Sequence, residues 1–145
     1  MAKRILVPLD GTPEAEAVLP FVSGLAHGTG ATVRLLHVAP APDNVLGPEG
    51  HVIAYADQEL SRVEYERHAY LAAQEARLGA VPVERAVRFG EPVEEILAEA
   101  DAFGAEVIVL TSGHRRGLSR LLLGSTAGAL AGRTALPLLV VRPGF

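Results

Sequence analysis

The sequence contains no cysteine and no long run of apolar residues. Without cysteine, the chain forms no disulfide, has no thiolate nucleophile and lacks any cysteine-type zinc site. No stretch approaches the roughly 20 apolar residues that a membrane-spanning helix needs. The first residues lead directly into a strand pattern, without the apolar core of a signal peptide. These absences predict a cytoplasmic protein that does not enter a membrane.

Length and composition predict one globular domain. The chain has 145 residues, of which 49% are hydrophobic and 21% are charged. This composition is typical of a folded protein with a buried core, and we expect a single domain over residues 1–145. The net charge of −4 argues against general affinity for nucleic acid. Against that acidic background, Arg115, Arg116 and Arg120 form a local basic cluster.

Five short apolar segments alternate with segments of helical pattern. We predict strands at residues 4–9, 32–38, 83–89, 107–111 and 138–141, and helices at about 13–27, 56–78, 92–103 and 125–132. Thr12 and Pro13 supply a cap and a first-turn proline for the first helix. Such alternation predicts parallel pairing through right-handed crossovers. The expected fold is α/β, a single doubly wound five-stranded parallel sheet in the order 3-2-1-4-5 with helices on both faces.

The segment 39–54 interrupts this regular pattern. Prolines and glycines at Pro40, Pro42, Gly47, Pro48 and Gly50 make it too broken for a helix or a strand. A long connection inside a compact domain is often a flap over a site, and a slack surface loop is the alternative. The sequence leaves both open.

The predicted strand order places a ligand site beyond the strands at 4–9 and 107–111, between which the order reverses. Asp10 follows the first of these strands, and a loop rich in glycine and arginine begins at Thr111, after the second. That loop leads into a helix start, whose free N–H groups favour an anion. We predict a phosphate cradle beside Asp10, with an ordinary surface turn as the alternative. Asp10 itself lines the site, caps the turn into the first helix, or does both.

Five motifs are spread over the chain. They are LVPLDGT at 6–12, LHV at 36–38, GEP at 90–92, GLSRLLLGS at 117–125 and PLLVVR at 137–142. Together they resemble the universal stress protein family over nearly the whole chain, and the last two are the most specific. The resemblance implies the fold described above and a dimer. It also implies a family that divides into proteins that bind ATP and proteins that do not.

In the ATP-binding members, the loop carries Gly, two residues, Gly, nine residues, Gly and then Ser or Thr. Gly124 and Ser125 match the end of that pattern, but Thr111 and His114 stand where the two leading glycines would be. If both positions need a left-handed backbone, the two replacements cost about 2–4 kcal/mol, or about 30-fold to 1,000-fold in affinity. The neighbouring Gly113 and the side-chain charge of His114, Arg115 or Arg116 offer partial compensation, so we predict retained but altered binding.

The resemblance implies ATP or a related adenine nucleotide, with or without Mg²⁺, as a regulatory ligand. The implied binding residues are Pro8, Asp10, Val38, Thr111, Gly113, His114, Gly124, Ser125 and Thr126. Pro8 would shape the pocket, Asp10 would sit near the nucleoside and the backbone of Val38 would meet the adenine edge. Ser125 and Thr126 would offer hydroxyl and N–H groups to phosphate. The alternative function is a stress-response interaction protein of the same fold that binds no nucleotide.

The sequence shows no catalytic residues and no metal site. No nucleophile, base and orienting group stand at a catalytic spacing, so we predict a binding module, with slow ATP hydrolysis as a weaker alternative. His27, His51 and His68 have no partners at metal-ligand spacing. His37 lies at the end of a buried strand, where a structural imidazole is expected.

The two predicted sheet edges differ in charge. The strand at 83–89 carries Glu84, Arg85 and Arg88, which discourage pairing with another chain. The other edge strand carries no charge and consists of Leu138, Leu139, Val140 and Val141. We predict a homodimer in which this strand pairs antiparallel with its own copy.

Overall fold

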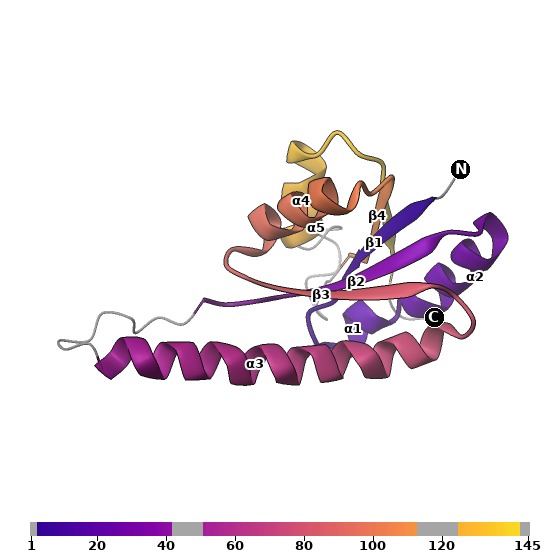
Figure 1. The fold of residues 1–145 in the computed structure, drawn as a ribbon. Coiled ribbons are helices and arrows are strands. Elements are labelled where there is room, and N and C mark those ends of the chain that lie inside the picture. Colours follow the sequence, from indigo (N-terminus) through magenta and orange to yellow (C-terminus); the bar gives the residue numbers. More distant parts are fainter. Residues whose placement is uncertain (1–2, 42–50, 113–124, 143–145) are drawn as a thin grey trace.

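The strands form one parallel sheet with helices on both faces (Figure 1). The computed structural model describes residues 3–41, 51–112 and 125–142, with the backbone alone for residues 51–57 and 125. The elements are β1 (Arg4–Pro8), α1 (Pro13–Glu16), α2 (Leu19–Thr29), β2 (Thr32–Ala39), α3 (His51–Glu75), the 3₁₀ helix η1 (Ala76–Leu78), β3 (Val83–Phe89), α4 (Pro92–Phe103), β4 (Val107–Thr111), α5 (Ser125–Arg133) and β5 (Leu138–Val141). The strand order β3-β2-β1-β4-β5 confirms the prediction.

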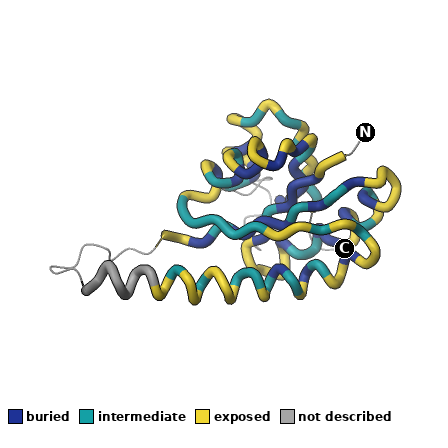
Figure 2. The backbone as a smooth tube through the Cα atoms, viewed as in Figure 1, coloured by how far each residue is buried: buried dark blue, intermediate teal, exposed yellow. Residues whose placement is uncertain are grey.

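Each face of the sheet has its own apolar core, because successive side chains of a strand point to opposite faces. On one face, Ile5 packs with Leu19 of α2 and Leu71 of α3. On the other, Leu6 packs with Ile96 of α4. Figure 2 shows the buried residues along the central strands and on the inner sides of the helices. Burying this apolar surface contributes about 25 cal/mol per Å² and fixes which helices cover which face.

The helix predicted at residues 13–27 is two helices in the structure. α1 ends at Glu16 because Pro20 has no N–H to donate to the Glu16 carbonyl, and α2 begins beyond this break. The predicted cap is confirmed, since the Oγ1 of Thr12 accepts a hydrogen bond from the N–H of Ala15 at 3.2 Å.

α3 is longer than the predicted helix. It begins at His51, within the segment 39–54 that was expected to be too broken for a helix. Gly50 is the last helix breaker of that segment, so the chain from His51 onward has no residue that opposes a helix. α3 lies along β3 and β2, and its amino-terminal part extends past the sheet (Figure 1). Residues 42–50 lie outside the described residues.

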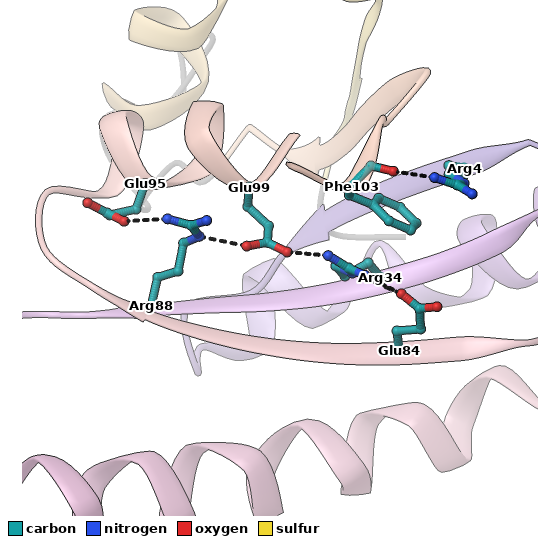
Figure 3. A network of polar contacts seen from close by, with 7 residues as sticks. All are labelled: Arg4, Arg34, Glu84, Arg88, Glu95, Glu99 and Phe103. Atoms are coloured by element: carbon teal, nitrogen blue, oxygen red, sulfur yellow. Dashed lines mark hydrogen bonds and ion pairs between the residues drawn. The ribbon is translucent and has the colours of Figure 1, made fainter. Parts of the chain in front are cut away.

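A network of ion pairs fastens α4 to β2 and β3 (Figure 3). Glu99 of α4 is buried, and its two oxygens accept hydrogen bonds from Arg34 at 2.5 Å and from Arg88 at 2.6 Å. Arg34 also pairs with Glu84, and Arg88 pairs with Glu95 at 3.0 Å. The two charged donors offset the free-energy cost of removing the Glu99 carboxylate from water. Loss of either arginine would leave part of a buried charge unpaired and so destabilise the fold.

Phe103 extends this attachment to the end of α4. The guanidinium carbon of Arg34 lies 4.2 Å from the centre of the Phe103 ring, and Arg4 of β1 donates a hydrogen bond to the Phe103 carbonyl at 2.7 Å. Cation–π and hydrogen-bond contacts of this kind add to the ion pairs. α4 is therefore held along its length, with Pro92 at its start placed at the carboxyl edge of the sheet.

Replacing Glu99 by glutamine should lower the free energy of unfolding by about 1–3 kcal/mol, because two charge-assisted hydrogen bonds lose their carboxylate. Burial acts to raise the pKa of Glu99, but Arg88 and Arg34 outweigh it and hold the pKa below the ordinary 4.5. The wild-type carboxylate thus adds stability above about pH 4.5 that is lost as the pH falls through the folded pKa.

Chemical denaturation between about pH 3 and pH 7 measures both effects. In Glu99→Gln, the loss of stability on acidification should be smaller than in the wild type. Glu106→Gln changes an exposed carboxylate that has no ion pair among the described residues, and it serves as the matched control. Identical acid dependence of Glu99→Gln and the wild type would contradict the role of the buried carboxylate.

Candidate functional site

A cleft of about 330 Å³ lies at the carboxyl ends of β1 and β4, where the strand order reverses. It is lined by Pro8, Leu9, Asp10, Ala15, Leu36, Val38, Pro92, Ile96, Leu110, Thr111, Ser112, Thr126 and Ala127. Its size is that of a small-molecule site, and its position is the one predicted for a ligand in a doubly wound sheet.

The structure brings several of the predicted site residues together. Those that line the cleft are Pro8, Asp10, Val38, Thr111 and Thr126. Gly113, His114 and Gly124 lie outside the described residues. The backbone of Ser125 opens α5, next to Thr126. The cleft therefore gathers residues from β1, β2, β4 and α5 that lie far apart in the sequence.

Asp10 both fixes a turn and lines the cleft. Its Oδ1 accepts hydrogen bonds from the N–H of Thr12 at 3.0 Å and from the Thr12 hydroxyl at 2.7 Å. Both bonds use Oδ1 and so leave Oδ2 for a ligand. The next residue, Gly11, has a φ of +89°, a conformation that favours glycine over residues with a Cβ. The capping role and the site position of Asp10 are thus compatible, as the sequence predicted.

The cleft has apolar walls on two sides. Leu36 and Val38 come from β2, and Pro92 and Ile96 come from α4. Such walls suit a flat, uncharged part of a ligand. The contribution of α4 was not predicted from the sequence. The GEP motif at 90–92 is the signal that precedes it, because Pro92 starts α4 at this edge of the sheet.

Thr111 does not need the backbone freedom of glycine. It is the last residue of β4 and pairs with Val141 of β5. The N–H of Ser112 continues the ladder by donating to the Val141 carbonyl at 3.1 Å. Because a strand backbone is open to any residue but proline, the cost expected for a left-handed threonine does not apply. The loss of ATP affinity expected from replacing the two glycines is then due to His114 alone. It amounts to about 1–2 kcal/mol, or about 5-fold to 30-fold in affinity.

Three further findings concern only the part of the chain that the structure describes. No helix in it combines the length and the hydrophobicity needed to cross a bilayer. No three His, Asp or Glu side chains in it lie close enough to share one metal ion. A second hollow, lined in part by Leu97, Asp101, Arg133 and Leu136, lies near the amino ends of β4 and β5 and contains none of the predicted site residues.

Comparisons of the sequence with known proteins give a consistent result. The model of the universal stress protein family matches residues 1–142. Universal stress protein YxiE of Bacillus subtilis is 29% identical over 148 residues, covering 98% of this chain and 100% of the relative. Universal stress protein G of Escherichia coli O157:H7 is 27% identical over 144 residues, covering 98% of this chain and 100% of the relative.

The fold is similar to those of several solved structures. The hypothetical protein MJ0577 has a TM-score of 0.78 at 26% identity, covering 98% of this chain and 96% of that one. A universal stress protein solved in complex with cAMP has a TM-score of 0.71 at 19% identity, covering 97% and 96%. The universal stress protein of Archaeoglobus fulgidus solved in complex with dAMP has a TM-score of 0.62 at 22% identity, covering 96% and 97%.

Proposed function

Because the chain belongs to the universal stress protein family, we propose that its cleft binds ATP or a related adenine nucleotide as a regulatory ligand. One observation carries the proposal. The cleft at the switch point joins apolar walls to a carboxylate, Asp10, and to the first turn of α5. These three environments match the three parts of a nucleotide: the base packs on apolar walls, the sugar hydroxyls bond to a carboxylate and the phosphate binds at a helix N-terminus. Two proteins of this fold were solved in complex with adenine nucleotides, cAMP and dAMP.

In this proposal each part of the nucleotide meets a different element. The adenine packs against the apolar walls, with its edge toward the backbone of Val38. The free Oδ2 of Asp10 accepts a hydrogen bond from the ribose. The phosphates face Thr126 and the N–H groups at the start of α5, where the helix dipole favours negative charge. When Mg²⁺ is present, it binds as a complex with the nucleotide phosphates.

The loop that precedes α5 completes the proposed site. Its sequence places Gly113, His114 and Gly124 between Thr111 and Ser125, the first residue of α5. Backbone amides at the glycines and the side chains of His114 and Ser125 would contact the phosphates. The proposed protein is a binding module of the cytoplasm, and the nucleotide is its regulatory ligand.

Asp10→Asn tests the proposal. Asparagine retains Oδ1 for the turn but removes the charge at Oδ2, so the affinity for ATP should fall by about 10-fold to 100-fold. Calorimetric titration with ATP, with and without Mg²⁺, measures the change. Asp101→Asn, in the hollow near the amino ends of the strands, is the matched control and should bind like the wild type. No heat from the wild type at about 1 mM nucleotide would favour the interaction protein without nucleotide instead.

Glycine substitutions separate the two positions at which the loop departs from the ATP-binding pattern. His114→Gly should strengthen ATP binding by up to about 5-fold to 30-fold. Thr111→Gly should not strengthen it, because the strand backbone gains nothing from glycine, and it should lower the free energy of unfolding by about 1 kcal/mol. Calorimetric titration measures the ATP affinity of both variants, and chemical denaturation measures the stability of Thr111→Gly. Tighter binding by Thr111→Gly would contradict the assignment of Thr111 to β4.

The proposal includes a homodimer formed through β5, which is an edge strand of the sheet. The carbonyls of Pro137 and Val141 accept hydrogen bonds from the N–H groups of Ile108 in β4 and of Ser112, which directly follows β4, both at 3.1 Å. Because backbone groups alternate in direction along a strand, the N–H and C=O of Val140 face the open edge. Antiparallel pairing of two copies would satisfy these groups in both chains.

Val140→Pro should convert the dimer to a monomer, because proline removes the outward N–H without removing a donor to β4. Light scattering measures the mass, and a thermal melt confirms that the variant is folded. Val140→Thr keeps the N–H and should remain dimeric. A folded Val140→Pro variant that is still a dimer would refute this interface.

A further inference from the structure

Arg88 joins the end of β3 to two turns of α4 (Figure 3). Its Nε donates a hydrogen bond to the Oε1 of Glu99 at 2.6 Å, and its Nη1 donates to the Oε1 of Glu95 at 3.0 Å. Glu95 and Glu99 stand four residues apart and therefore share one face of α4. A single guanidinium thus ties two successive turns of the helix to the strand.

The same two turns carry one apolar wall of the cleft. This α4 wall consists of Pro92 and Ile96, which are also four residues apart and lie beside the face that binds Arg88. The β2 wall of the cleft consists of Leu36 and Val38. Because Arg88 holds α4, it also holds the α4 wall at its distance from the β2 wall.

Arg88 lies directly beside the β2 wall as well. In the register of β2 and β3 it pairs with Val38, so the two side chains lie on the same face of the sheet. That face is the one covered by α4, because Val38 packs against the core that contains Ile96. Arg88 is therefore next to one wall on the sheet and bonded through its side chain to the helix that carries the other.

The GEP motif gives this arrangement its space and its start. Gly90 has a φ of +145°, and a Cβ at this position would lie 2.9 Å from the Oε2 of Glu95. Alanine would therefore displace the carboxylate that Arg88 binds. Glu91 caps α4, since its Oε1 accepts a hydrogen bond from the N–H of Glu94 at 2.8 Å. The third residue of the motif is the proline of the α4 wall.

We propose that Arg88 is a positioning residue, which sets the gap between the α4 wall and the β2 wall to the thickness of a flat ring. The ring is the adenine of the nucleotide, so the effect on affinity rests on the function proposed above, whereas the attachment of α4 does not. A planar base contacts both walls at once. A gap that is about 0.5–1 Å too wide loses about a quarter to a half of the van der Waals attraction.

Arg88→Gln tests the proposal, because glutamine is shorter and uncharged and does not bridge the two carboxylates. In the protein without ligand, NMR hydrogen exchange at the Ile96 amide should become about 3-fold to 10-fold faster, relative to Leu6 in β1. The affinity for ATP, measured by calorimetric titration, should fall by about 3-fold to 30-fold. Arg85→Gln is the matched control and should change neither quantity, since Arg85 pairs with Glu75 on the opposite face of the sheet.

Pro92→Ala shows whether Arg88 acts through the α4 wall. Alanine removes part of this wall and leaves the ion pairs in place. If Arg88 acts through the wall, the loss of ATP affinity in the double variant should be smaller than the product of the two separate losses. A loss equal to that product would mean that Arg88 affects binding independently of the wall, and it would overturn the positioning role.

Glu95→Ala is a milder variant, because it removes one ion pair of Arg88 and leaves the buried pair with Glu99. It should change exchange and affinity in the same directions by smaller factors, and it decides the test if Arg88→Gln does not fold. Unchanged exchange at Ile96, relative to Leu6, would overturn the attachment. Faster exchange with unchanged affinity, in a protein that binds ATP, would overturn the positioning role. If the wild type binds no nucleotide, the proposed function fails on its own, and exchange at Ile96 alone decides whether Arg88 holds the α4 wall.

Discussion

The reversal of strand order between β1 and β4 is the constraint on which the rest of the molecule depends. Right-handed crossovers carry α4 and α5 to one face of the sheet and α1, α2 and α3 to the other. The helices that follow β1 and β4 therefore lie on opposite faces, and the carboxyl ends of these strands stay open between them. The cleft is a consequence of this topology, and the side chains around it determine what it can bind.

Different interactions hold the two sides of the cleft. The wall from α4 is held by charge, since Glu99 lies between Arg34 and Arg88. The Asp10 turn is held by the hydrogen bond from the buried His37 imidazole to the Leu9 carbonyl and by the two hydrogen bonds from Thr12 to Asp10. Acid weakens the α4 attachment, because the Glu99 carboxylate is protonated as the pH falls through its lowered pKa. The binding geometry thus depends on two supports that mutations can separate.

Much of the fold could be predicted from the sequence, because short apolar strands alternate with capped helices. The break near Pro20 was missed because the apolar pattern continues through it, although proline itself carried the signal. Of the site, Asp10 and Thr111 could be placed because the ends of adjacent parallel strands meet at one edge. Pro92 could not, since its position depends on how a whole helix packs on the sheet, which periodicity alone does not specify.

A crystal structure of the protein grown with excess ATP tests most directly whether the cleft is a nucleotide site. The account predicts adenine against the walls near Val38, the ribose at the Oδ2 of Asp10 and the phosphates at the first turn of α5. A cleft without nucleotide under these conditions, or ATP bound instead in the hollow near Arg133, would contradict it.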